Sequence, residues 1–194
     1  MFLIDLLKTK KRKFQAIIIA GVILVSSVFL AYPFLPTVEY YVMPPKDNLV
    51  KEKDLQKDIV KGRVLIISKI GVKIPIIEGE NESEALNKGA WRLPQTSIPE
   101  IGGNMALAAH RFKYMPPHQE TFYLLDKLSE GDIFQVFWEG REYRYEVVST
   151  EIVKPTNTEV ISNTNEPTVT LITCHPLFSD KNRLIVKGRL IEIL

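Results

Sequence analysis

The sequence has little cysteine and little net charge, and each shortage excludes a class of protein. Its 194 residues include one cysteine, Cys174, so neither an internal disulfide nor a multi-cysteine zinc site can form. The formal net charge is only +2, and the densest basic run lies at the extreme N-terminus, which argues against a nucleic-acid-binding surface on the folded part. Internal repeats and low-complexity tracts are also missing, so the length indicates one globular domain with an appendage.

The N-terminal segment has the pattern of a membrane anchor. A cationic cluster within residues 8–13 is followed by residues 14–38, which carry no charge and are mostly aliphatic. A helix needs about 20 apolar residues to cross the hydrocarbon layer. We therefore predict a transmembrane helix over residues 14–36, ending near Pro33 and Pro36. A cleaved signal peptide would have a shorter apolar run and a small-x-small cleavage site, which Leu30-Ala31-Tyr32-Pro33 matches poorly.

The charge asymmetry around this helix predicts its orientation. Positively charged residues favour the cytoplasmic side, so we expect residues 1–13 to be a cytoplasmic tail and the chain after the helix to lie outside the cell membrane. Residues 37–60 are rich in Lys, Asp, Glu and Pro and are interpreted as a linker. Residues 61–194 are predicted to form the folded domain.

The folded domain is predicted to be mainly β. Short β-branched or alternating runs, typical of strands, occupy residues 64–67, 73–77, 105–109, 133–138, 142–148, 168–173 and 183–186. Helical spacing is limited to residues 82–87 and 121–128. About eight short strands with little helix favour a closed or nearly closed β-barrel.

Polar groups able to do chemistry lie at the ends of these predicted strands. Cys174 follows the run 168–173, His110 follows the run 105–109, and Arg183 opens the last strand. If the last two strands pair antiparallel, Cys174 and Arg183 become neighbours. An imidazole and a guanidinium both favour a thiolate nucleophile. The imidazole can then protonate a leaving amine, and the guanidinium can stabilise an oxyanion. A Cys, a His and an Arg at strand ends also occur together by chance, and a lone cysteine is often just a buried apolar residue.

Several motifs resemble the sortase family of cysteine transpeptidases. Thr170-Leu171-Ile172-Thr173-Cys174 matches the family's TLxTC nucleophile motif. The segment 183–186 resembles the strand with the family's active-site arginine, and 102–111 resembles the segment around its histidine. The resemblance covers roughly residues 64–193, and the N-terminal anchor agrees with it. It implies an eight-stranded sortase-type β-barrel with short helices.

The resemblance also implies roles and partners. Cys174 would attack the threonine carbonyl of an LPxTG-like sorting signal on a surface protein, and His110 would protonate the departing amine. Arg183 would hold the substrate and the oxyanion. The acyl group would pass to a cell-wall or pilin amine, with no cofactor. Thr173 would help to position the substrate, although it could equally be an ordinary β-branched strand residue.

The family's variable features narrow the resemblance to a small, lidless type nearer class D or E. The sequence has no Asp-Pro-aromatic lid motif, and residues 154–167 are too few for the long inserted helix of some members. Glu100 lies in the loop where one class places a calcium ligand, but matching partners are missing, so no metal site is predicted. The histidines His118 and His175 are interpreted as loop residues, and a zinc site with His110 and Cys174 is not favoured by their spacing.

Two other functions are compatible with the sequence. An extracellular cysteine hydrolase would use the same residues and let water resolve the acyl-enzyme. A catalytically inert surface-binding domain would keep the barrel without the reaction, although the presence of Cys174, His110 and Arg183 argues against it.

Overall fold

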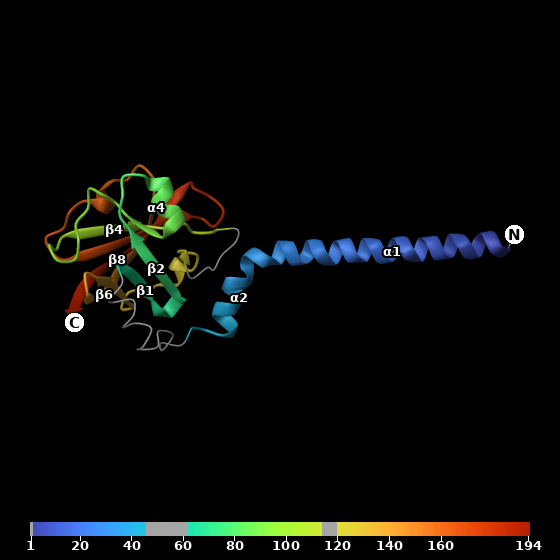
Figure 1. Ribbon diagram of the computed structural model, residues 1–194, viewed down its shortest axis with the longest axis horizontal. Helices are drawn as coiled ribbons and strands as arrows, with labels where there is room; N and C mark the ends of the chain where they lie inside the picture. Colours follow the sequence, from blue (N-terminus) through green and yellow to red (C-terminus); the bar gives the residue numbers. More distant parts are fainter. Residues whose placement is uncertain (1, 46–61, 114–119) are drawn as a thin grey trace. The chain divides into compact units, whose positions relative to one another are not determined.

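The structure is a computed structural model that describes residues 2–45, 62–113 and 120–194 (Figure 1). The chain divides into two compact units, residues 1–39 and residues 40–194. The first unit contains the long N-terminal helix, and the second contains the β-barrel.

The N-terminal unit is almost entirely helical. Helix α1 (Phe2–Ala31) is followed by the 3-10 helix η1 (Tyr32–Phe34) and then by α2 (Leu35–Val42). The segment Lys11–Val42 contains an 18-residue stretch with a mean hydropathy of 2.4, and by length and composition it could cross a membrane. Helix α1 ends at Ala31, before Pro33, and helical structure continues through η1 and α2 to Val42, so the bounds 14–36 of the transmembrane helix stay a prediction. Pro33 and Pro36 lie in the first positions of η1 and α2, where the missing N–H group breaks no helical hydrogen bond. The predicted linker therefore begins inside α2, and its residues 46–60 lie outside the described part of the chain.

The second unit is a closed barrel in the strand order β1-β2-β3-β4-β7-β8-β6-β5. The strands are β1 (Val64–Ile67), β2 (Val72–Ile77), β3 (Ala90–Arg92), β4 (Asn104–Ala108), β5 (Ile133–Trp138), β6 (Arg141–Val153), β7 (Thr168–His175) and β8 (Asn182–Ile193). Pairings β2–β3 and β4–β7 are parallel, and the remaining pairs are antiparallel. The predicted eight-stranded barrel is thus confirmed.

Short helices connect the strands. They are η2 (Ser68–Ile70), α4 (Glu82–Lys88), η4 (Leu125–Lys127) and η5 (Glu159–Ile161). Helix α4 begins after Asn81, whose side chain accepts a hydrogen bond from the Glu84 N–H, and it ends at Lys88, before Gly89. The helical spacing at 121–128 becomes turns followed by η4, because this segment is too short and too buried to form a full helix.

Two strands are longer than their apolar runs predict. Strand β6 has 13 residues and β8 has 12, and the two pair along most of their length. Their additional residues are mostly charged or exposed and were therefore not recognised as strand. Cross-strand ion pairs accompany these extensions, with Lys187 Nζ 3.2 Å from Glu151 and Arg144 Nη1 2.9 Å from Glu192.

The barrel interior is filled by alternate residues of every strand. On β4 and β7 these are Met105, Leu107, Val169 and Leu171, each at most 1% exposed. Side chains of a strand alternate between its two faces, so the residues between them project outward from the barrel. This alternation decides which side chains can meet outside the barrel wall at the end of these strands.

Candidate active site

The pairing of β4 with β7 places His110 beside Cys174. In this parallel pair Ala108 lies opposite Ile172, and the hydrogen bond from the Ala109 N–H to the Ile172 carbonyl, at 3.1 Å, extends the ladder by one residue. Two residues further along each chain come His110 and Cys174, on the same outward face as Ala108 and Ile172. The proximity of His110 and Cys174 therefore follows from the backbone register of two segments that are far apart in the sequence.

The pairing of β7 with β8 places Arg183 on the other side of Cys174. These two residues lie directly opposite each other in the antiparallel register. Opposite residues of such a pair project to the same face of the sheet. The sulfur-bearing residue therefore has the histidine on one neighbouring strand end and the arginine on the other.

A pocket of about 320 Å³ opens at this end of the barrel. Its lining includes His110 and Cys174, together with Arg111, Phe112, Phe178, Ser179 and Asp180. Arg183 is half-buried beside it, and its Nη1 donates to the Asp180 carbonyl at 3.0 Å and the Asn182 carbonyl at 3.2 Å. The thiol and the imidazole thus share the pocket, while the guanidinium lies against the loop that forms its wall.

The electrostatic surroundings of His110 favour its neutral form. Partial burial lowers the pKa of His110 below its ordinary value of 6.5, and the charge of Lys113 lowers the pKa further. The carboxylate of Glu82 opposes these effects. A neutral imidazole next to a thiol can accept the thiol proton and later return it, which is the property that acid–base catalysis requires.

Thr173 lies inside the barrel wall. It is 2% exposed, and its Oγ1 donates to the carbonyl of Ala109 at 2.8 Å. The hydroxyl therefore ties the residue before Cys174 to the residue before His110. With so little exposed surface, any effect of Thr173 on substrate position has to pass through these two strand ends.

One residue of this site was not predicted from the sequence. Arg111 is only 7% exposed, and its guanidinium contacts the ends of two other segments. It contacts Tyr123 and Asp126 on one side and Cys174 and His175 on the other. Arginine is almost never fully buried unless it is paired, and the pairing partner comes from a distant segment, so composition and periodicity gave no signal for it.

Two further histidines and the possibility of a metal site remain to be placed. His175 follows Cys174 and is half-buried, with Nδ1 near Arg111, whereas His118 lies outside the described residues. Within residues 2–45, 62–113 and 120–194, no group of three or more His, Cys, Asp or Glu side chains could hold a metal ion. Glu100 is exposed in the loop before β4.

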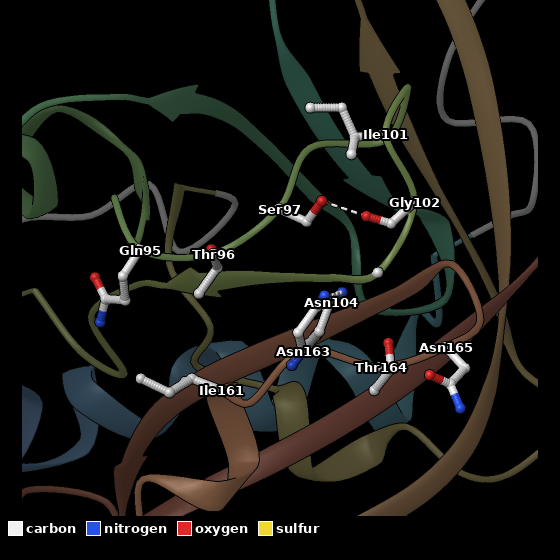
Figure 2. A pocket seen from close by; sticks show the side chains of 11 residues that line it. Gln95, Thr96, Ser97, Ile101, Gly102, Asn104, Ile161, Asn163, Thr164 and Asn165 are labelled. Carbon is white, nitrogen blue, oxygen red and sulfur yellow. Dashed lines mark hydrogen bonds between the residues drawn. The ribbon is translucent and has the colours of Figure 1, made fainter.

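A larger hollow, of about 560 Å³, lies near the start of β4 and contains none of the predicted site residues. Figure 2 shows its side chains, which are neutral amides, hydroxyls and aliphatic groups. Asn104 holds its floor: Nδ2 donates to the carbonyls of Val160 and Ser162, both at 3.1 Å, and Oδ1 accepts from Thr170 at 2.8 Å. Its lining holds hydroxyls but no titratable side chain that could activate one of them, so we do not expect acyl-transfer chemistry in this hollow.

The residue Asn163 completes this arrangement, which we call the Asn104 clamp (Asn104, Asn163, Thr170 and the carbonyls of Val160 and Ser162). The side-chain Oδ1 of Asn163 accepts a hydrogen bond from the Asn104 N–H at 3.1 Å. Gly103 has a φ of +80°, and a Cβ there would come within 2.1 Å of that same oxygen. The close approach therefore requires glycine, and the clamp fixes the loop between β6 and β7 against β4.

Comparisons with known proteins agree with this geometry. The family model described as Sortase domain matches residues 65–191. Sortase SrtE1 of Streptomyces coelicolor is 31% identical over 144 residues, covering 66% of this chain and 40% of the relative. Sortase D of Bacillus subtilis is 29% identical over 130 residues, covering 65% of this chain and 62% of the relative. The chain thus spans about two fifths to three fifths of the length of these relatives.

A solved structure shares the fold. The crystal structure of Sortase E1 from Streptomyces coelicolor with a tripeptide in the active site aligns with a TM-score of 0.60 and 28% sequence identity. The alignment covers 68% of this chain and 88% of that chain.

Proposed function

The chain belongs to the sortase family, and on that premise we propose that it is a membrane-anchored cysteine transpeptidase of the class D or E type. The observation that carries the proposal is that Cys174 is opposite Arg183 in the β7–β8 register and lines one pocket with His110. His110 follows the β4–β7 ladder by two residues, which supports its assignment as the partner of Cys174. The likeness to Sortase SrtE1 and Sortase D supports the subclass.

The first half of the reaction forms a thioester. His110 accepts the proton of the Cys174 thiol, and the thiolate attacks the carbonyl carbon of a threonine in an LPxTG-like sorting signal. The carbonyl oxygen becomes an oxyanion in the tetrahedral intermediate. As this intermediate collapses, the bond between the threonine carbonyl and the next nitrogen breaks, and the protonated His110 gives its proton to the leaving amine.

The oxyanion is stabilised by Arg183. Among the described residues, its hydrogen bonds to loop carbonyls both come from Nη1, and we propose that Nε and Nη2 donate to the bound substrate. A guanidinium is permanently charged and gains most when negative charge develops next to it, which is in the intermediate rather than in the bound substrate.

The second half transfers the acyl group. An amine of the cell wall or of a pilin attacks the thioester, loses a proton to His110, and forms a new amide as the Cys174 thiolate leaves. The partners are surface proteins with a C-terminal sorting signal and the acceptor amine. We propose that the pocket of about 320 Å³ receives the acyl chain and then the incoming amine.

Membrane attachment is proposed for the N-terminal helix. The segment Lys11–Val42 has the length and hydropathy of a spanning helix, and its apolar side chains are exposed. The basic cluster at residues 8–13 favours a cytoplasmic N-terminus, which places the barrel outside the cell. An enzyme that acts on exported surface proteins has to be held on that side.

The test uses the full-length chain in detergent micelles with an LPxTG-type peptide, with and without an added primary amine. Wild type is expected to give a ligated product whose mass includes the amine, and Cys174→Ala is expected to give none. A hydrolysed product that is unchanged by added amine would favour the cysteine hydrolase. Equal cleavage by wild type and Cys174→Ala would refute the assignment of the nucleophile.

A further inference from the structure

The reaction outlined above leaves one buried charge unused. Arg111, the residue after His110, has a side chain that is 8% exposed. Its guanidinium makes contacts on all three nitrogens: Nε donates to Tyr123 O at 3.2 Å, Nη2 donates to Asp126 Oδ1 at 2.8 Å, and Nη1 lies 3.4 Å from Cys174 O and 3.3 Å from His175 Nδ1. It thus joins the chain after β4, the segment around η4 and the end of β7.

Keeping this cation in the barrel wall is unfavourable by itself. Burial lowers the pKa of Arg111, and its interactions with Asp126, Tyr123 and Cys174 oppose that effect. Apolar side chains of similar volume often stabilise a fold as well as a buried ion pair does. Stability of the fold alone therefore does not explain an arginine at this position. Its contacts with the Cys174 carbonyl and His175 Nδ1 at the end of β7 explain it better.

Those two atoms belong to the nucleophile and its neighbour. A guanidinium only donates hydrogen bonds and does not lose its charge, so His175 Nδ1 has to act as the acceptor. This contact is compatible with the tautomer of His175 that carries its proton on Nε2. The contact to the Cys174 carbonyl holds the backbone of the nucleophile at the same time. Asp126 fixes the other edge of the guanidinium, so the planar group has one orientation.

We propose that Arg111, anchored by Asp126, is a positioning residue for Cys174 that locks the end of β7 to the segment carrying His110 and fixes the tautomer of His175. The inference rests on the proposed function, because the value of this arrangement is that the thiol and the imidazole keep a reactive geometry. Arg111 itself does not touch the substrate. A displacement of about 1 Å in a reacting group can cost about 100-fold in rate.

The kinetic test compares Arg111→Lys, Asp126→Asn and the control Arg144→Lys in the full-length protein. Lysine keeps the charge but loses the planar fork, so kcat for peptide cleavage is expected to fall by about 10- to 100-fold with little change in KM. Asp126→Asn is expected to lower kcat in the same direction while leaving Arg111 in place, which keeps the proposal testable if an Arg111 variant fails to fold. Arg144 pairs with Glu142 at 2.7 Å and with Glu192 at 2.9 Å on the β6–β8 side of the barrel, and its substitution should leave kcat unchanged.

A spectroscopic readout separates positioning from a general loss of stability. The protein has only three histidines, so ¹⁵N-labelled histidine gives a simple spectrum in which His175 is assigned by its loss in His175→Gln. Wild type should show the Nε2–H tautomer at His175, and Arg111→Lys should show a mixture. A kcat within about twofold of wild type in both Arg111→Lys and Asp126→Asn, or an unchanged tautomer in Arg111→Lys, would overturn the proposal.

The two proposals fail in different ways. If wild type neither cleaves nor ligates the peptide but its His175 tautomer still depends on Arg111, the proposed function fails and the positioning contact stands. If wild type is active, and if the His175 tautomer and kcat are the same in Arg111→Lys as in wild type, the proposed function stands and the positioning role is wrong.

Discussion

The two ends of the β4–β7 pair use the same outward face for opposite purposes. At the start of β4, the Asn104 clamp joins neutral groups whose hydrogen bonds satisfy one another, and it holds the loop between β6 and β7. At the far end, the thiol of Cys174 and the imidazole of His110 line a pocket, and the guanidinium of Arg183 is opposite Cys174 on β8.

If the proposed function is right, this small barrel separates stability and reactivity between the two ends of one strand pair. A buried amide with all its partners contributes rigidity and carries no charge that could react. The charged end is less fully satisfied and partly exposed, which is the arrangement that a reactive site needs. If the two ends differ as their chemistry indicates, substitutions at the charged end should change the rate of peptide cleavage, and substitutions in the Asn104 clamp should change stability.

The largest effect is expected from removing the imidazole. His110→Gln should lower kcat for peptide cleavage by about 10²- to 10⁴-fold, because proton transfer to the leaving amine loses its donor. The measurement is a steady-state rate with a fluorogenic LPxTG-type peptide. A rate within about threefold of wild type would remove His110 from the reaction.

A somewhat smaller effect is expected from substituting Arg183, the cation on β8 opposite Cys174. Arg183→Lys should lower kcat by about 10²- to 10³-fold, because a single ammonium cannot reproduce the donor geometry of the guanidinium at an oxyanion. Arg189→Lys is the matched control on the same strand, where the arginine is exposed and pairs with Glu146 at 3.6 Å. Equal losses in both variants would mean that Arg183 has only a structural role.

At the other end, the effect should be on stability. Asn104→Ala leaves the Thr170 hydroxyl and the carbonyls of Val160 and Ser162 without their partner, and it should lower the free energy of unfolding by about 1–3 kcal/mol. We expect kcat to stay within about threefold of wild type. Urea denaturation and peptide cleavage measure the two quantities, with exposed Asn165→Ala as the control in the same hollow. A drop in kcat as large as that of His110→Gln would erase the distinction between the two ends.

The smallest effect concerns pH. Because the folded protein lowers the pKa of His110 below 6.5, the unfolded chain binds more protons at this residue between the two pKa values. The unfolding free energy should therefore rise as pH increases through that window and reach its full value above pH 6.5. Urea denaturation at pH 5 and pH 8 should show a smaller pH difference in His110→Gln than in wild type. An equal difference in the two proteins would show that His110 is not perturbed.

Local patterns sufficed to predict a barrel and most of its strands, because a strand that is buried on one face alternates. They did not predict the extensions of β6 and β8, whose residues are mostly charged or exposed. They also indicated Cys174, His110 and Arg183 as candidates. The parallel pairing that brings residue 110 beside residue 174 is a non-local property, and only the resemblance to a family suggested it. Arg111 could not be found in this way, since an arginine after a strand normally faces solvent and its partner Asp126 belongs to another element.

The most direct test is to trap the acyl-enzyme. Full-length protein is mixed with an LPxTG-type peptide in the absence of added amine, quenched in acid, and digested for mass spectrometry. The predicted result is the peptide acyl group on Cys174, attached through its threonine carbonyl and released by hydroxylamine, with no adduct in Cys174→Ala. An adduct on another residue, or cleavage that proceeds without any adduct and persists in Cys174→Ala, would contradict the placement of the reaction at this end of the barrel.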